Sequence, residues 1–68
     1  MKNKFANKLK ELREESSLSQ LELGKMLNVT QAGVAKWEAG TREPGLDMLI
    51  IIAQFFNVTT DYLLGLED

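Results

Sequence analysis

The sequence contains no cysteine and no histidine among its 68 residues. Without cysteine, neither a disulfide framework nor a thiolate metal site can stabilise so small a chain. Without histidine, the usual zinc, haem and imidazole-based catalytic sites are excluded, and only carboxylates remain as acid–base or metal-binding groups. A hydrophobic core must therefore stabilise the domain alone, and we expect no metal, no cofactor and no enzymatic activity.

Long apolar runs are also missing. The longest one, 48–53, is far too short to cross a bilayer, and the basic start of the chain continues directly into an amphipathic pattern rather than a signal sequence. We therefore expect a cytoplasmic protein with no membrane partner and no evident small-molecule ligand. With 68 residues and 44% apolar composition, the chain has room for a single domain, 1–68.

The net charge is only −2, which argues weakly against a nucleic-acid partner because most of that affinity comes from neutralising phosphates. The charges are unevenly distributed, however. The chain ends on Glu67 and Asp68, whereas the basic residues of its first part are Lys2, Lys4, Lys8, Lys10 and Arg13. A basic face is therefore compatible with the composition.

Apolar residues at spacings of three and four predict short amphipathic helices along the whole chain, and no segment has a strand pattern. Phe5, Leu9 and Leu12 are the first example. The predicted helices are 5–15, 20–27, 31–39, 46–56 and 60–64. Because their connections are short, we expect a compact all-α domain of five helices.

Two of these helices are separated by only a few residues in the middle of the chain. Ser19 and Glu22 have the spacing of a capping box at the start of 20–27. Asn28 can take the left-handed conformation that ends a helix, and Thr30 is a natural N-cap for the next one. This arrangement is typical of a helix-turn-helix, here about 19–39, whose second helix enters the major groove of DNA.

Gly24 lies inside the first helix of this pair, where a glycine costs about 1 kcal/mol relative to alanine. We expect it to have a packing role, namely the close approach of helix 31–39 through Val34. Small residues on the first turn of that helix likewise let its backbone approach the groove.

The sequence matches the residue pattern of a known protein family over about residues 5–64. The residues that carry it are Leu9, Leu12, Arg13, Leu18, Ser19, Gln20, Leu23, Gly24, Leu27, Asn28, Val29, Val34, Trp37, Glu38, Gly40, Pro44, Leu46, Leu49, Ile52, Ala53, Phe56, Val58 and Leu63. On these residues the sequence resembles the repressor/Cro-like (Xre-type) helix-turn-helix family of phage and bacterial regulators. It departs from that pattern at Asn28, where glycine is commonest, at Gly24, where alanine is, and at Gly45, where a capping serine is usual.

The resemblance implies a transcriptional regulator of the repressor type that reads double-stranded DNA with helix 31–39. Gln31 is similar to the residue that such repressors direct at base edges, and a glutamine amide can bond the N6 and N7 groups of adenine together. Ala32 would meet a thymine methyl, and Lys36 would reach a guanine edge or a phosphate.

The same resemblance implies contacts to the DNA backbone. Gln20, at the start of helix 20–27, is similar to the phosphate-clamping glutamine of the family, and Thr30, Thr41 and Arg42 resemble backbone contacts from the flanking cap and loop. These contacts would position the protein without specifying a sequence. For Gln20, Gln31, Lys36 and Arg42 the alternative is an ordinary solvent-exposed side chain.

Three further residues have structural roles in the prediction. Arg13 and Glu38 resemble the pair that bridges the first and third helices in this family, and removal of one partner of such a pair costs several kcal/mol. Trp37 is expected in the core rather than as a platform for stacking bases, because it lies three residues after Val34 on the same face.

Helix 46–56 has more apolar residues than one core face needs. The positions assigned to the core are Leu46, Leu49, Ile50, Ala53 and Phe56. Met48, Ile51 and Phe55 should then be exposed on the opposite side. We expect a homodimer through this stripe, together with Leu64 and Leu66, because such repressors present two recognition helices about one DNA turn, or roughly 34 Å, apart. A downstream domain covering the stripe, or wholly buried packing, are the alternatives.

Two other functions are compatible with the residues. The same fold with an acidic balance would suit a protein-interaction module that uses the stripe to bind another regulator. An enzyme is the weakest alternative, because the carboxylate pairs Glu14 with Glu15 and Glu38 with Glu43 lie in no predicted pocket and have no neighbours to tune a pKa.

Overall fold

The structure, a computed structural model, describes residues 4–67, and that range contains five α-helices and no strand. The helices are α1 Phe5–Glu15, α2 Gln20–Leu27, α3 Gln31–Ala39, α4 Leu46–Phe56 and α5 Thr60–Leu64. The predicted all-α class and the five predicted helices are confirmed. No helix within 4–67 has the length and apolar character needed to cross a membrane. Lys2 and Asp68, part of the predicted charge asymmetry, lie outside the described residues.

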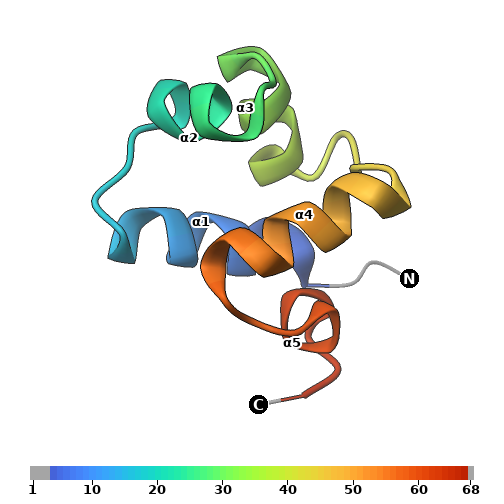
Figure 1. The fold of residues 1–68 in the computed structure, drawn as a ribbon. Coiled ribbons are helices and arrows are strands. Elements are labelled where there is room, and N and C mark those ends of the chain that lie inside the picture. The colour runs from blue at the N-terminus through green and yellow to red at the C-terminus, as the bar shows by residue number, and fades with distance from the viewer. Residues whose placement is uncertain (1–3, 68) are drawn as a thin grey trace.

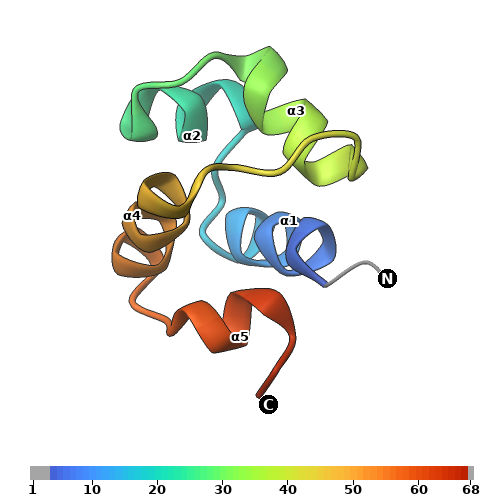
Figure 2. The same ribbon diagram turned by 90° about the vertical axis from the view of Figure 1, so that its right-hand side faces the viewer.

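The helices are arranged at three levels (Figures 1 and 2). The helices α2 and α3 lie together at one end of the domain, α1 and α4 occupy the middle, and α5 lies at the opposite end. The main packing contacts join α2 with α3, α1 with both α3 and α5, and α4 with α5. The helix-turn-helix is therefore carried on a base formed by the other three helices.

Each helix contributes one fully buried large side chain to the centre of the domain. These side chains are Leu9, Leu23, Val34, Ile52 and Leu63. The rest of the buried core consists of Phe5, Leu27, Trp37 and Ala53. Because every helix covers part of the others, no helix can bury its apolar face alone, and the domain should unfold as one cooperative unit.

Helix α4 turns a face to the core that agrees only in part with the one that the sequence predicted. Its buried residues are Ile52 and Ala53. Leu46 is 80% exposed and Ile50 is 48% exposed, so their assignment to the core is wrong. Of the expected core positions, Ala53 is buried, and Leu49 and Phe56 pack against the cluster partly buried.

The expected exposed stripe of α4 is correspondingly different. Met48 and Phe55 are half-buried and pack against the core, so the expectation that they are exposed is wrong. Ile51 is 45% exposed. Because α4 is apolar at every position except Asp47 and Gln54, its pattern could not decide which side faces inward, and the packing against α5 and the remaining core decides it.

The capping box predicted at the start of α2 is present. The Ser19 hydroxyl accepts the backbone N–H of Glu22 at 3.0 Å, and the Glu22 carboxylate accepts the backbone N–H of Ser19 at 2.8 Å. The bond donated by the Ser19 backbone N–H is the main cause that lowers the pKa of Glu22 from its ordinary value of 4.5. The charged form of Glu22 therefore stabilises the start of the helix-turn-helix.

The capping box should make part of the stability pH-dependent. Because the pKa of Glu22 is lower in the folded state, its charge stabilises the fold above pH 4.5 and loses that effect as the pH falls through the folded value. At neutral pH, Glu22→Gln should melt at a lower temperature than the wild type, and the difference should vanish in acid. Thermal denaturation across the pH range measures this. Glu11→Gln, at an exposed position on α1, is the control, and an equal pH-dependent difference there would contradict the assignment.

Candidate nucleic-acid interface

Three residues join α2 to α3. Asn28 ends α2 in the left-handed conformation, with φ 62° and ψ 41°. Thr30 has extended backbone, φ −80° and ψ 158°, and its hydroxyl accepts the backbone N–H of Gly33 at 3.0 Å, which caps α3. The predicted turn residue and N-cap are confirmed, and together they fix the angle at which α3 leaves α2.

Gly24 allows a close approach, but not the one expected. A Cβ atom at Gly24 would lie 2.8 Å from the carbonyl oxygen of Val29 and 3.2 Å from the carbonyl carbon of Thr30. The backbone N–H of Val29 also donates to the Gly24 carbonyl at 2.8 Å. Gly24 therefore makes room for the backbone of the turn. The prediction that it makes room for helix α3 through Val34 is wrong.

Helix α3 has one side buried in the core and another side exposed. Val34 is fully buried and Trp37 is 7% exposed, so the core position predicted for Trp37 is confirmed. Gln31, Ala32 and Lys36, the three expected base-reading residues, are all exposed. Two of them lie on the first turn, so the N-terminal half of α3 offers a polar amide and a small side chain close to the helix backbone.

Three of the four expected backbone contacts, Thr30, Thr41 and Arg42, flank α3 and are exposed. The Thr30 hydroxyl accepts from Gly33 and keeps its own proton for donation to a phosphate. The Thr41 hydroxyl instead donates to the carbonyl oxygen of Lys36 at 3.3 Å. Its proton is therefore already used at the C-terminal end of α3, whereas Arg42 is an exposed guanidinium, a group that binds anions well.

The exposed basic residues on and around the helix-turn-helix are Lys25, Lys36 and Arg42. Lys8 on α1 lies elsewhere: its ammonium group sits 4.5 Å from the centre of the Tyr62 ring on α5, a cation–π contact that holds it at the other end of the domain. Within residues 4–67 no group of three or more acidic side chains is placed to hold a metal ion.

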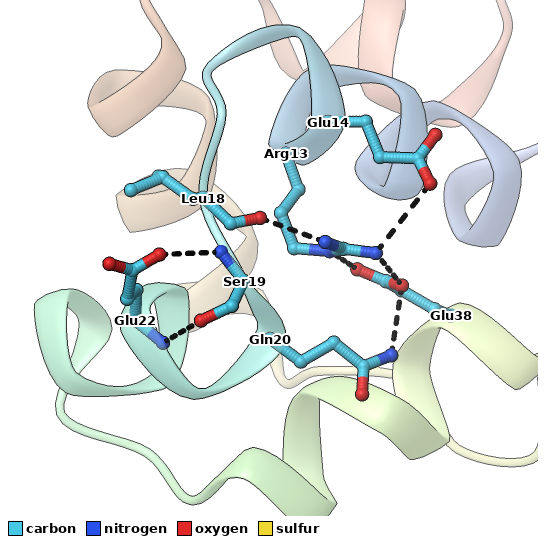
Figure 3. Close-up of polar contacts among 7 residues, drawn as sticks. All are labelled: Arg13, Glu14, Leu18, Ser19, Gln20, Glu22 and Glu38. Atoms are coloured by element: carbon cyan, nitrogen blue, oxygen red, sulfur yellow. Dashed lines mark hydrogen bonds and ion pairs between the residues drawn. The ribbon is translucent and has the colours of Figure 1, made fainter.

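A half-buried polar cluster lies behind the interface, where α1, α2 and α3 meet (Figure 3). Arg13 binds Glu38 with two hydrogen bonds, from Nε to Oε2 at 2.6 Å and from Nη2 to Oε1 at 3.0 Å. Its third donor, Nη1, binds the carbonyl oxygen of Leu18 at 2.8 Å. The hydrogen bond to Glu38 raises the pKa of Arg13 above its ordinary value. The predicted structural pair is confirmed, and it fixes both the α1–α2 loop and the end of α3.

Gln20 belongs to this cluster in the structure. Its Nε2 donates to Oε1 of Glu38 at 3.1 Å, and the side chain extends from the start of α2 toward α3 (Figure 3). The sequence predicted a side chain directed at the DNA backbone. The structure brings Gln20 together with Arg13 and Glu38, and a contact between residues 18 positions apart leaves no local sequence signal. This bond uses one of the two protons on the amide nitrogen, so the contact to the DNA backbone stays a prediction.

Comparison with known proteins places the arrangement in a family. The model of the helix-turn-helix family matches residues 9–63. The chain is 39% identical over 64 residues to the HTH-type transcriptional activator BcrR of Enterococcus faecalis, covering 94% of this chain and 31% of that protein. It is 34% identical over 64 residues to the HTH-type transcriptional regulator ImmR of Bacillus subtilis, covering 94% of this chain and 50% of that one. The chain thus spans half or less of the length of these relatives, whose names denote regulators rather than enzymes.

Solved structures of transcriptional regulators have the same fold. A transcriptional regulator from Listeria innocua superposes with a TM-score of 0.90 at 29% identity, covering all of this chain and 64% of that one. The P22 c2 repressor in complex with a synthetic operator superposes with a TM-score of 0.82 at 27% identity, covering 88% of this chain and 91% of that one. The chain belongs to the helix-turn-helix family of the repressor and Cro type.

Proposed function

We propose that this chain is the DNA-binding domain of a transcriptional regulator, a repressor, that inserts α3 into the major groove of double-stranded DNA. The observation that carries the proposal is the exposed N-terminal half of α3, held at a fixed angle to α2 by the Asn28–Thr30 turn. Its support from known proteins is the similarity to the P22 c2 repressor, whose structure was solved with operator DNA. Gln31, Ala32 and Lys36 would read the bases.

The backbone contacts would come from both ends of α3. Thr30 offers a free hydroxyl proton at the N-terminal end, and Arg42 offers a guanidinium beyond the C-terminal end. The backbone N–H and the hydroxyl of Thr41 both donate to the carbonyl oxygen of Lys36 in the free protein, at 3.1 and 3.3 Å, so Thr41 would contact a phosphate by exchanging its hydroxyl bond. Gln20 would contact a phosphate through the second proton of its amide nitrogen, because the first is donated to Glu38.

The functional unit in this proposal is a homodimer on an inverted-repeat operator. With few basic residues on the reading face, one subunit should bind weakly and with strong salt dependence, and two linked subunits gain the missing affinity. Of the expected interface, Ile51 and Leu66 are exposed, at 45% and 71%, whereas Leu64 is half-buried. Leu46 and Ile50, on the same helix as Ile51, are also exposed, at 80% and 48%.

The two kinds of DNA contact should respond differently to substitution. Gln31→Ala should lose about 1–3 kcal/mol of binding free energy and relax the preference at one base pair, because it removes a base contact. Arg42→Ala should weaken binding to all sequences alike and reduce the salt dependence, because it removes a phosphate contact. Binding titrations against the selected site and against unrelated duplexes, at several salt concentrations, measure both effects. An equal loss on all sequences from both variants would contradict this division.

The experiment that tests the function is selection of random duplex DNA at low salt by the wild type and by Gln31→Ala, with sequencing of the bound pools. An enriched inverted repeat with half-sites about one turn apart, changed at one position by the substitution, is the expected result. An enriched single half-site would remove the dimer from the proposal. No enrichment would overturn it in favour of a protein-interaction module.

A further inference from the structure

Gly33 lies on the first turn of α3, where a glycine makes a helix less stable. It is the third residue of the helix. A glycine there is less favourable than an alanine, because its backbone loses more conformational freedom on folding. Gly40 and Gly65 have the positive φ that favours glycine, whereas Gly33 does not. The backbone conformation of Gly33 is therefore open to an alanine.

The packing of the free protein does not require a glycine at this position either. Apart from its chain neighbours and the backbone of its own helix, a Cβ atom at Gly33 would meet only the hydroxyl oxygen of Thr30, at an ordinary contact distance of 3.4 Å. At Gly24 the same atom would lie 2.8 Å from the carbonyl oxygen of Val29, so the turn needs that glycine. Of the two glycines inside the helices of residues 4–67, Gly33 is thus the one that the fold does not explain.

The open space at Gly33 lies beside the residues proposed to read the bases. Successive residues of a helix are about 100° apart, so Gln31 and Gly33 lie on opposite flanks of Ala32. Helical side chains lean back toward the start of the helix, so Lys36 should extend over the turn that contains Gly33. One flank of Ala32 therefore carries an amide, and the other flank carries no side chain.

We propose that Gly33 is a specificity-determining residue, whose missing side chain lets the DNA approach the backbone of α3 closely enough for Gln31 and Ala32 to reach the bases. This rests on the DNA-binding function proposed above. A methyl group at Gly33 would hold the first turn of α3 away from the groove, and hydrogen bonds to base edges weaken steeply with such a displacement. Phosphate contacts from a long side chain such as Arg42 adapt more easily. The chain thus gives up helix stability at Gly33 for the fit of α3 to DNA.

The test is Gly33→Ala, whose two expected effects have opposite signs. Without DNA, the variant should melt about 2–8 °C higher than the wild type, because alanine favours the helix and its Cβ atom fits. Its dissociation constant for the operator selected by the wild type should rise roughly 10–100-fold, whereas that for unrelated duplexes should change less than about threefold. Thermal denaturation followed by circular dichroism, and binding titrations at one salt concentration, measure these effects.

The chain offers a matched control in Gly45→Ala. A Cβ atom at Gly45 also has open space around it, with nothing within 4 Å, but Gly45 precedes α4 and does not lie on α3. This control should leave both dissociation constants within about threefold of the wild type. Gly33→Ser separates size from polarity: it is larger than Gly33→Ala and can donate a hydrogen bond, and it should bind the operator at least as weakly.

Four results would overturn the inference while leaving the proposed function standing. Gly33→Ala could bind the operator within about threefold of the wild type, or lose affinity equally for the operator and for unrelated duplexes. It could also melt below the wild type, which would mean that the fold needs the glycine. Gly33→Ser could bind the operator more tightly than Gly33→Ala. If the wild type itself binds no DNA, the proposed function fails and this inference fails with it.

Discussion

Replacing Arg13 with methionine should lower the free energy of unfolding by about 3–5 kcal/mol, because it leaves the buried carboxylate of Glu38 without its charged partner. Methionine fills much of the same volume, so the loss measures the unpaired charge rather than a cavity. A domain of 68 residues has a total stability of about 3–10 kcal/mol, so this single change removes a large part of it. Urea denaturation followed by circular dichroism measures the effect.

Two further variants separate the ion pair from other effects of the substitution. Lys10→Met, on the exposed side of the same helix, should change the stability by less than about 0.5 kcal/mol. The double variant Arg13→Met with Glu38→Leu removes both charges and should recover much of the lost stability, as buried ion pairs replaced by apolar residues do. If Arg13→Met behaves like Lys10→Met, the pair has no structural role.

Leu23→Ala should be the second most damaging change, with a loss of about 2–5 kcal/mol. Leu23 on α2 is fully buried, and α2 packs mainly against α3, so the substitution opens a cavity directly behind the helix-turn-helix. The free energy of unfolding in urea again measures the loss. At low temperature, where the variant remains folded, the exposed residues of α3 are unchanged and DNA binding should persist.

Leu21→Ala on the same helix is the matched control. Leu21 is 48% exposed, so its removal returns less apolar surface to water and leaves no cavity, and the loss should be below about 1 kcal/mol. Equal losses for Leu21→Ala and Leu23→Ala would mean that α2 is not packed against the core as the structure describes.

The helices and their ends could be predicted from the sequence because their signals are local. Ser19 with Glu22, Asn28 and Thr30 each act on backbone groups within a few residues, so their chemistry determines where a helix begins or ends whatever surrounds it. The Arg13–Glu38 pair was found through the family resemblance and not through spacing, since 25 residues separate the partners.

The predictions that failed depended on how helices are placed against each other. Helix α4 has apolar side chains on all its sides, so the sequence could not show which side faces the core. Leu46 and Ile50 were therefore wrongly assigned to the core. The neighbour of Gly24 proved to be the turn backbone, which no side-chain pattern reveals. The bond from Gln20 to Glu38 was not among the predictions, because it depends on a partner that only tertiary structure brings near.

The separation of residues on α3 also bears on how such a protein can change during evolution. Val34 and Trp37 anchor the helix in the core, whereas Gln31, Ala32 and Lys36 project from it and support no other part of the fold by burial. If α3 contacts the bases as proposed, substitutions at these three positions can change the DNA target while the domain stays folded. A duplicated copy of the protein can therefore acquire a new target without an unstable intermediate. Grafting the same three positions from another family member is the equivalent route for an engineer.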